Sequence, residues 1–202
     1  MVQSLPASLG FEEFVAQFGD DFQHELIDGE LIEMEPTGPH EQVTGFINLQ
    51  LNLAIAQLNQ PYFIPMRCLI KPLALMSAFK PDVIVLDRRA LETEPLWRRE
   101  PVITLGTSVK LVVEVVSTNW QNDYARKLDD YQALGIPEYW IIDYLGLGGT
   151  LFIGSPKQPT ITVCQLQDNR YEMRSVRGED RIVSPTFPNL QFAAQQVFAS
   201  AD

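Results

Sequence analysis

Lys110–Ser117, KLVVEVVS, is an apolar run broken by a single carboxylate at Glu114. Its valines predict a buried strand, and alternation along a strand puts Glu114 on the same face as Val112 and Val116. A lone carboxylate among valines is costly, so it must be protonated, face solvent at an edge, pair with a cation or bind a metal. A solvent edge would also expose the two valines. The pattern therefore favours a cation partner or a metal ion.

A second carboxylate, Asp82, opens the next most apolar strand, in the run from Pro81 to Leu86. Taken alone, an Asp after Pro at the start of a strand is typical of turn chemistry. Two carboxylates on neighbouring strands are different, because Mg²⁺ takes carboxylate oxygens while it keeps several waters for a substrate phosphate.

Lys127 lies on the helix predicted after the Glu114 strand, in QNDYARKLDDYQALG, residues 121–135. It stands four residues after Asp123 and four before Tyr131, at the margin of the buried face of that helix, so its ammonium could reach the end of the strand. The alternative is an exposed Asp123–Lys127 pair, which would contribute little to stability.

The remaining pattern predicts one α/β (α+β) domain, a mixed sheet flanked by helices. Asp28-Gly29 predicts a two-residue hairpin turn, and Pro39 begins the main core helix. The domain spans residues 1–202, and residues 146–202 form a C-terminal β-rich extension packed on it. Strands are expected at 62–70, 73–76, 81–86, 109–117, 138–143, 150–153, 160–166 and 171–176, and helices from residue 8 to 18 and from 190 to 198.

The charge of the chain is unevenly distributed. The 202 residues carry a net charge of −11, and residues 1–66 contain no Lys or Arg. Positive charge gathers in residues 67–99, where Arg88, Arg89, Arg98 and Arg99 bracket a loop. A polyanion would dock there, because phosphate contacts need a positive surface; the alternative is a solvated loop.

No apolar run reaches the ~20 residues that a membrane span requires, and the N-terminal residues lack the pattern of a signal peptide. We therefore expect no membrane partner and a cytoplasmic protein. Cys68 and Cys164 lack the spacing of a zinc site or a disulfide framework.

Several segments together resemble a known family. ELIDGELIEM, the stretch ending in His40, PDVIVL, LVVEVVS and DYARKLDDYQALGIPEYWIID are similar, in this order, to the Uma-two family of bacterial endonuclease-like proteins. That family belongs to the PD-(D/E)XK superfamily. The resemblance covers roughly residues 11–145, and it implies a restriction-endonuclease-like fold with a divalent-metal nuclease site.

The resemblance also implies roles for individual residues. Asp82 and Glu114 match the two acids of the superfamily and, with the backbone carbonyl of Val115, would hold Mg²⁺ or Mn²⁺. The superfamily lysine is expected two residues after the second acid, where this chain has Val116. In the Uma-two pattern the lysine lies instead on the following helix, which places it at Lys127 in this chain. The acid that precedes the lysine in that pattern falls on Asp123.

A further N-terminal acid of the family falls on Glu30, with Glu25 as the alternative. His40 either contacts a phosphate or a catalytic neighbour, or serves as a helix cap. One departure is the loop Ser117-Thr118-Asn119-Trp120, because the family usually has a proline there. This change affects the path of the chain between Glu114 and Lys127.

The function implied is a magnesium-dependent endodeoxyribonuclease, a hydrolase of phosphodiester bonds in DNA, with a homodimer as one option for its assembly. The alternative is a catalytically silent module of the same fold that binds nucleic acid or a protein, which the acidic balance of the chain favours. A third reading is a toxin-like or structural element of mobile DNA.

Overall fold

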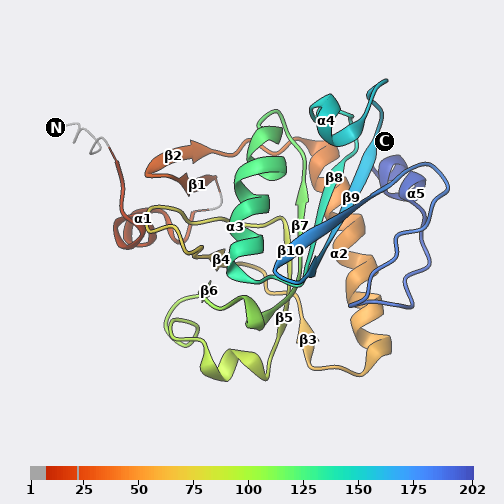
Figure 1. Ribbon diagram of the computed structural model, residues 1–202. Helices are drawn as coiled ribbons and strands as arrows, with labels where there is room; N and C mark the ends of the chain where they lie inside the picture. Colours follow the sequence, from red (N-terminus) through yellow and green to blue (C-terminus); the bar gives the residue numbers. More distant parts are fainter. Residues whose placement is uncertain (1–7, 22) are drawn as a thin grey trace.

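A six-stranded mixed sheet forms the centre of the molecule (Figure 1). The computed structural model describes residues 8–21 and 23–202. Strands β7 and β8 are parallel, and the other neighbours pair antiparallel. The strand order is β10 (Arg170–Val176), β9 (Thr160–Gln167), β8 (Glu138–Asp143), β7 (Val109–Val115), β5 (Val83–Asp87) and β3 (Tyr62–Phe63).

Helices cover both faces of this sheet (Figure 1). On one face, α2 (Gly38–Leu58) buries Val43, Ile47 and Leu51 against Val113 and Val115 of β7. On the other face, α3 (Lys127–Leu134) contributes Tyr131 to the core that contains Val112 and Val116. The predicted α/β class, a mixed sheet flanked by helices, is confirmed.

Smaller elements border the sheet on the side of α3. The predicted hairpin forms from β1 (His24–Ile27) and β2 (Glu30–Glu33), and its turn residues Asp28 and Gly29 have φ of 51° and 86°, as a type I′ turn requires. The other elements here are α1 (Phe11–Phe18), the parallel pair β4 (Leu69–Ile70) and β6 (Val102–Ile103), and the 3₁₀ turns η1 (Ala90–Thr93) and η2 (Gly106–Ser108).

Residues 146–202 add β9 and β10 to the sheet, because β9 pairs with β8 along its length. The chain ends in α5 (Ala194–Phe198) and η4 (Ala199–Ala201), which contact α2. Among the described residues, no helix has both the length and the apolar character that a membrane crossing needs.

The strand predicted over 62–70 forms instead as two short strands, β3 and β4, in different sheets. Two further strand predictions are wrong. Residues 150–153 form a one-turn helix, α4 (Thr150–Ile153), which follows Gly149 in extended conformation and buries Ile153 while Leu151 stays exposed. Residues 73–76 form no strand, because Leu73 and Leu75 point into solvent and only the backbone of Met76 is anchored, by Gly29 N–H. In the second case the chain reaches a sheet edge only after this segment, where Ala78 bridges to Leu26 of β1.

Candidate active site

Pairing of β5 with β7 brings the two strand carboxylates together. Val83 lies opposite Val113, so Asp82 and Glu114 follow on the same face of adjacent strands. The backbone N–H of Val115 donates to Asp82 Oδ2 at 2.6 Å. Both carboxylates line one pocket of about 880 Å³ between α2, the β1–β2 hairpin and the start of α3.

Lys127, the first residue of α3, lines the same pocket directly after the π-helical turn η3 (Asn122–Arg126). The residue is 4% exposed, and its Nζ lies 3.2 Å from Glu114 Oε2 and 3.5 Å from Asp123 Oδ1. The exposed helix pair considered as the alternative is therefore not what forms. Lys127 is a buried cation among carboxylates.

The N-terminal acid in this cluster is Glu25, not Glu30. Glu25 Oε2 lies 3.1 Å from Lys127 Nζ, and Glu25 Oε1 accepts the backbone N–H of Lys80 at 2.6 Å. Glu30 is exposed and does not line the pocket, because it directly follows the hairpin turn, opposite Ile27, while Glu25 lies at the other end of β1. Both acids lie on one hairpin, and the tertiary position of that hairpin determines which of them reaches the pocket.

His40 and Tyr131 contact the two strand acids from opposite faces of the sheet. His40 lies in the first turn of α2, where its backbone N–H donates to the side chain of the N-cap Thr37 at 3.4 Å. Its Nε2 lies 3.1 Å from the Val115 carbonyl oxygen and 3.5 Å from Asp82 Oδ2. The Tyr131 hydroxyl donates to Glu114 Oε1 at 2.7 Å. Both side chains are in position to orient a carboxylate or the carbonyl.

Burial and mutual repulsion govern the electrostatics of the cluster. Burial raises the pKa of Glu114 well above its usual range, Lys127 opposes this shift, and Asp82 adds to it. Burial alone would lower the pKa of Lys127, but Glu114, Glu25 and Asp123 outweigh it and raise that pKa. Lys127 is therefore an ammonium ion throughout the neutral range, and the excess negative charge lies on the carboxylates.

The donor set suits a hard divalent cation. Within residues 8–21 and 23–202, no three His, Cys, Asp or Glu side chains form a metal-binding group on their own. However, Asp82, Glu114 and Val115 all line the pocket, and His40 Nε2 lies close to both the Val115 carbonyl oxygen and Asp82 Oδ2. Mg²⁺ binds through one or two carboxylates and keeps several waters, so these oxygen atoms fit the ion.

Comparisons with known proteins agree with this arrangement. A profile of the Uma2 family, described as "Putative restriction endonuclease", matches residues 11–195. The chain belongs to the Uma2 family. The match confirms the family resemblance and extends it past residue 145, into the C-terminal strands and α5. No curated protein matches the sequence.

Among solved structures, the Uma2 chain resembles "a putative nuclease belonging to DUF820" from Anabaena variabilis. The two share 16% sequence identity, the match covers 96% of this chain and 99% of the other, and the TM-score is 0.69. At this identity the likeness shows the fold, which is restriction-endonuclease-like.

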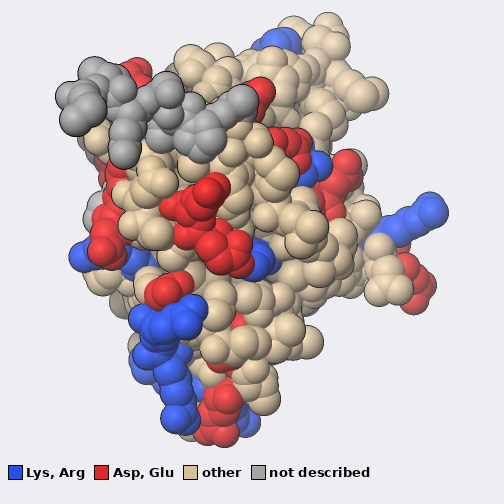
Figure 2. Space-filling model, turned by 90° about the vertical axis from the view of Figure 1, so that its left-hand side faces the viewer, with Lys and Arg blue, Asp and Glu red and all other residues tan. Residues whose placement is uncertain are grey.

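Two groups of basic residues of the Uma2 protein lie in separate places. Lys80 and Arg67 line the pocket. Arg88 and Arg89 directly follow β5, at the end of that strand opposite to Asp82. Figure 2, viewed from the side of the β1–β2 hairpin, shows acidic side chains across the middle of this face and Lys and Arg side chains gathered at its lower end. The pocket itself is thus bordered mainly by acids.

Asp123 gives the Uma2 protein a pH-dependent stability. Burial raises the pKa of Asp123 from its ordinary value to about 7, and Lys127 offsets only part of this shift. Between pH ~4 and ~7 the folded state therefore keeps a proton that the unfolded state has lost, so stability falls as pH rises, by at most about 1.4 kcal/mol per unit.

Asn at this position does not titrate. We expect that Asp123→Asn, without metal, gains stability over the wild type as the pH is raised from 5 to 8, measured by urea unfolding. An identical difference in the free energy of unfolding at both pH values would contradict the raised pKa.

Proposed function

We propose that this Uma2 protein is a divalent-metal-dependent endonuclease that hydrolyses phosphodiester bonds in DNA. The observation that supports it most is that Asp82, Glu114, Val115 and Lys127 line one pocket, with the Lys127 ammonium 3.2 Å from Glu114. The family description and the nuclease title of the structural neighbour point the same way. The Mg²⁺ or Mn²⁺ ion, the DNA substrate and the residue roles below are part of the proposal.

Asp82, Glu114 and the Val115 carbonyl would hold the cation. A divalent cation at this position polarises a phosphate and lowers the pKa of a water molecule. The negative charge of the two carboxylates would favour binding of the ion. Tyr131 fixes one oxygen of Glu114 through its hydroxyl, which leaves the other oxygen to face Lys127.

Lys127 supplies a fixed positive charge. Glu25 and Asp123 hold its Nζ at 3.1 Å and 3.5 Å, so the ammonium needs little reorganisation when a phosphate arrives. A charge fixed in advance stabilises the negative charge that develops on the phosphate oxygens in the transition state. Glu25 and Asp123 are positioning residues in this scheme, because they act through Lys127.

His40 would keep the Val115 carbonyl in position. A proton on Nε2 lets the ring donate to that carbonyl or to Asp82. Burial lowers the pKa of His40, but Asp82, Glu41 and the Val115 carbonyl together outweigh burial and raise the pKa overall. His40 therefore gains a proton more readily than an ordinary histidine does.

Supercoiled plasmid tests the proposal. With Mg²⁺ or Mn²⁺ the wild type should convert it to nicked or linear DNA, and EDTA should stop the conversion. Binding of the plasmid without any cleavage in either metal would instead support the silent binding module, which the acidic border of the pocket favours.

A further inference from the structure

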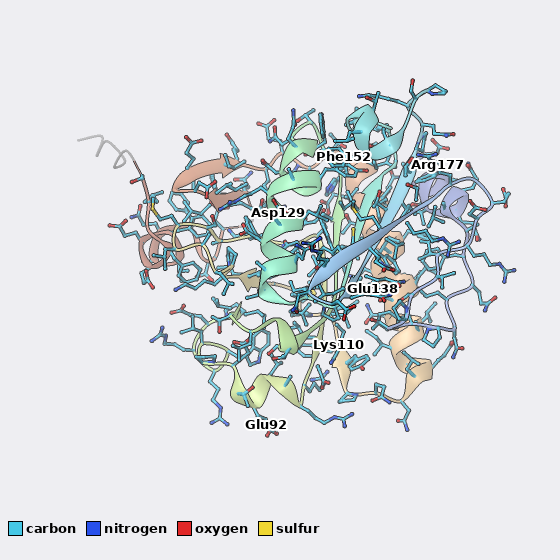
Figure 3. All side chains as sticks on the ribbon, viewed as in Figure 1. Glu92, Lys110, Asp129, Glu138, Phe152 and Arg177 are labelled. Atoms are coloured by element: carbon cyan, nitrogen blue, oxygen red, sulfur yellow. The ribbon has the colours of Figure 1, made fainter. Side chains whose placement is uncertain are left out.

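A second depression, of about 450 Å³, lies at the far end of β5 from the pocket. Asp82 precedes β5 and Arg88 follows it, so the two sites are about 20 Å apart at ~3.3 Å per strand residue. Figure 3 shows Glu92, on the η1 turn beside the depression, at the lower tip of the molecule. The lining consists of Phe63, Arg88, Leu91, Glu92, Trp97 and Arg98.

Aromatic rings form one wall of this depression. Phe63 and Trp97 meet edge to face, with ring centroids 6.2 Å apart and planes at 71°. Both rings are partly buried and pack on the core beneath α3, which holds them in place. The guanidinium of Arg88 lies 4.3 Å from the centroid of the Phe63 ring. An aromatic corner with a stacked guanidinium is thus preformed at the surface.

Positive charge surrounds this corner. Arg88 and Arg98 line it and are exposed, with Arg89 and Arg99 next to them in the sequence. Glu92 is the acid on its rim. An Arg stacked on a ring is common in proteins and alone indicates only packing. This depression also contains Trp97 and a second exposed arginine, Arg98, and it lies in the basic part of an acidic chain. Packing of Arg88 on Phe63 does not require these additional groups.

This combination suits nucleic acid. Aromatic faces stack on unpaired bases irrespective of sequence, and guanidinium groups pair with phosphates through two parallel hydrogen bonds. A base pair in a duplex hides its faces, so stacking on Trp97 selects a nucleotide that is unpaired.

We propose that the Phe63–Trp97 depression binds an unpaired nucleotide of a nucleic-acid strand, whose base stacks on Trp97 while the flanking phosphates pair with Arg88 and Arg98. This site deepens the proposed nuclease function and rests on it for the nature of the substrate. It lies apart from the pocket, so it anchors the strand without taking part in hydrolysis.

The fluorescence of Trp97 tests this proposal in the full-length protein. All titrations use EDTA, so that no cleavage occurs. A short single-stranded oligothymidylate should quench the emission of the wild type, and a duplex with blunt ends should not. Trp97→Phe should lose the quenching, because the other two tryptophans, Trp120 and Trp140, lie outside the depression.

The salt dependence of the same titration tests the phosphate contact. Arg98→Gln should weaken binding and lower the slope of log K against log salt by about 0.7, the value for one phosphate of a single strand. Arg174→Gln makes the same change on exposed β10 and should alter neither quantity.

The proposal is overturned if oligothymidylate causes no quenching, if Trp97→Phe retains it, if the Arg98→Gln slope equals that of the wild type, or if duplex quenches equally. These results are independent of the nuclease assay. Metal-dependent cleavage without quenching of Trp97 would refute only nucleotide binding in the depression. Quenching of Trp97 without cleavage would refute only the proposed hydrolysis.

Discussion

Lys127→Met should lower the rate of metal-dependent plasmid cleavage by about 10²- to 10³-fold, the usual cost of removing a preorganised charge that acts on a transition state. The affinity for Mg²⁺ should be similar or slightly higher, because a positive charge next to the ligands is lost. Calorimetric titration of Mg²⁺ beside the cleavage assay measures both quantities on one preparation.

The same substitution should also reduce stability. Methionine leaves Glu25, Glu114 and Asp123 buried without the cation that contacts all three. Breaking a buried ion pair costs about 3–5 kcal/mol, so urea should unfold this variant at a lower concentration than the wild type. Assays therefore need circular dichroism to show that the variant is folded at the assay temperature.

Lys157→Met is the matched control. Lys157 is exposed, donates to the Leu147 carbonyl and does not line the pocket. It should keep wild-type cleavage and stability. Full cleavage by Lys127→Met would show that Lys127 is not the lysine that acts on the phosphate.

Glu114→Gln should also lose cleavage, but through weaker Mg²⁺ binding and without a loss of stability. Loss of a residue that only contacts a metal ligand lowers metal affinity about 10- to 100-fold. Removal of the charge of a ligand itself should weaken Mg²⁺ binding by at least as much, and cleavage should fall with it. The free energy of unfolding at pH 8 should be unchanged or higher, because burial already favours the neutral form of this side chain.

Glu30→Gln is the matched variant for that experiment. It makes the same chemical change on the exposed carboxylate that the family resemblance preferred and that lies outside the pocket. We expect Mg²⁺ binding and cleavage like those of the wild type. If Glu30→Gln lost as much Mg²⁺ binding and cleavage as Glu114→Gln, Glu30 would be part of the active site.

Much of this arrangement could be predicted from local pattern. The valine-rich run around Glu114 predicts a buried strand, and β-strand alternation places its carboxylate on the α3 face. Asp28-Gly29 predicts the hairpin because that pair tolerates positive φ. Such features depend on neighbouring residues alone, so a single sequence suffices.

The choice between Glu25 and Glu30 depends instead on tertiary structure. Both acids lie on one hairpin, and only its docking beside α3 brings Glu25 to Lys127. Burial of Lys127 is equally non-local, because it requires carboxylates from β1, β7 and η3. The Phe63–Trp97 corner likewise joins residues from β3 and the β5–β6 segment.

Cleavage of supercoiled plasmid by the wild type and by Asp82→Asn, purified identically, tests the central claim most directly. Asp82 is part of the proposed ion site and only partly buried, so its replacement should leave the fold intact. The account predicts cleavage by the wild type with Mg²⁺ or Mn²⁺, none with EDTA, and little or none by Asp82→Asn. Equal cleavage by both proteins, or wild-type cleavage that persists in EDTA, would contradict it.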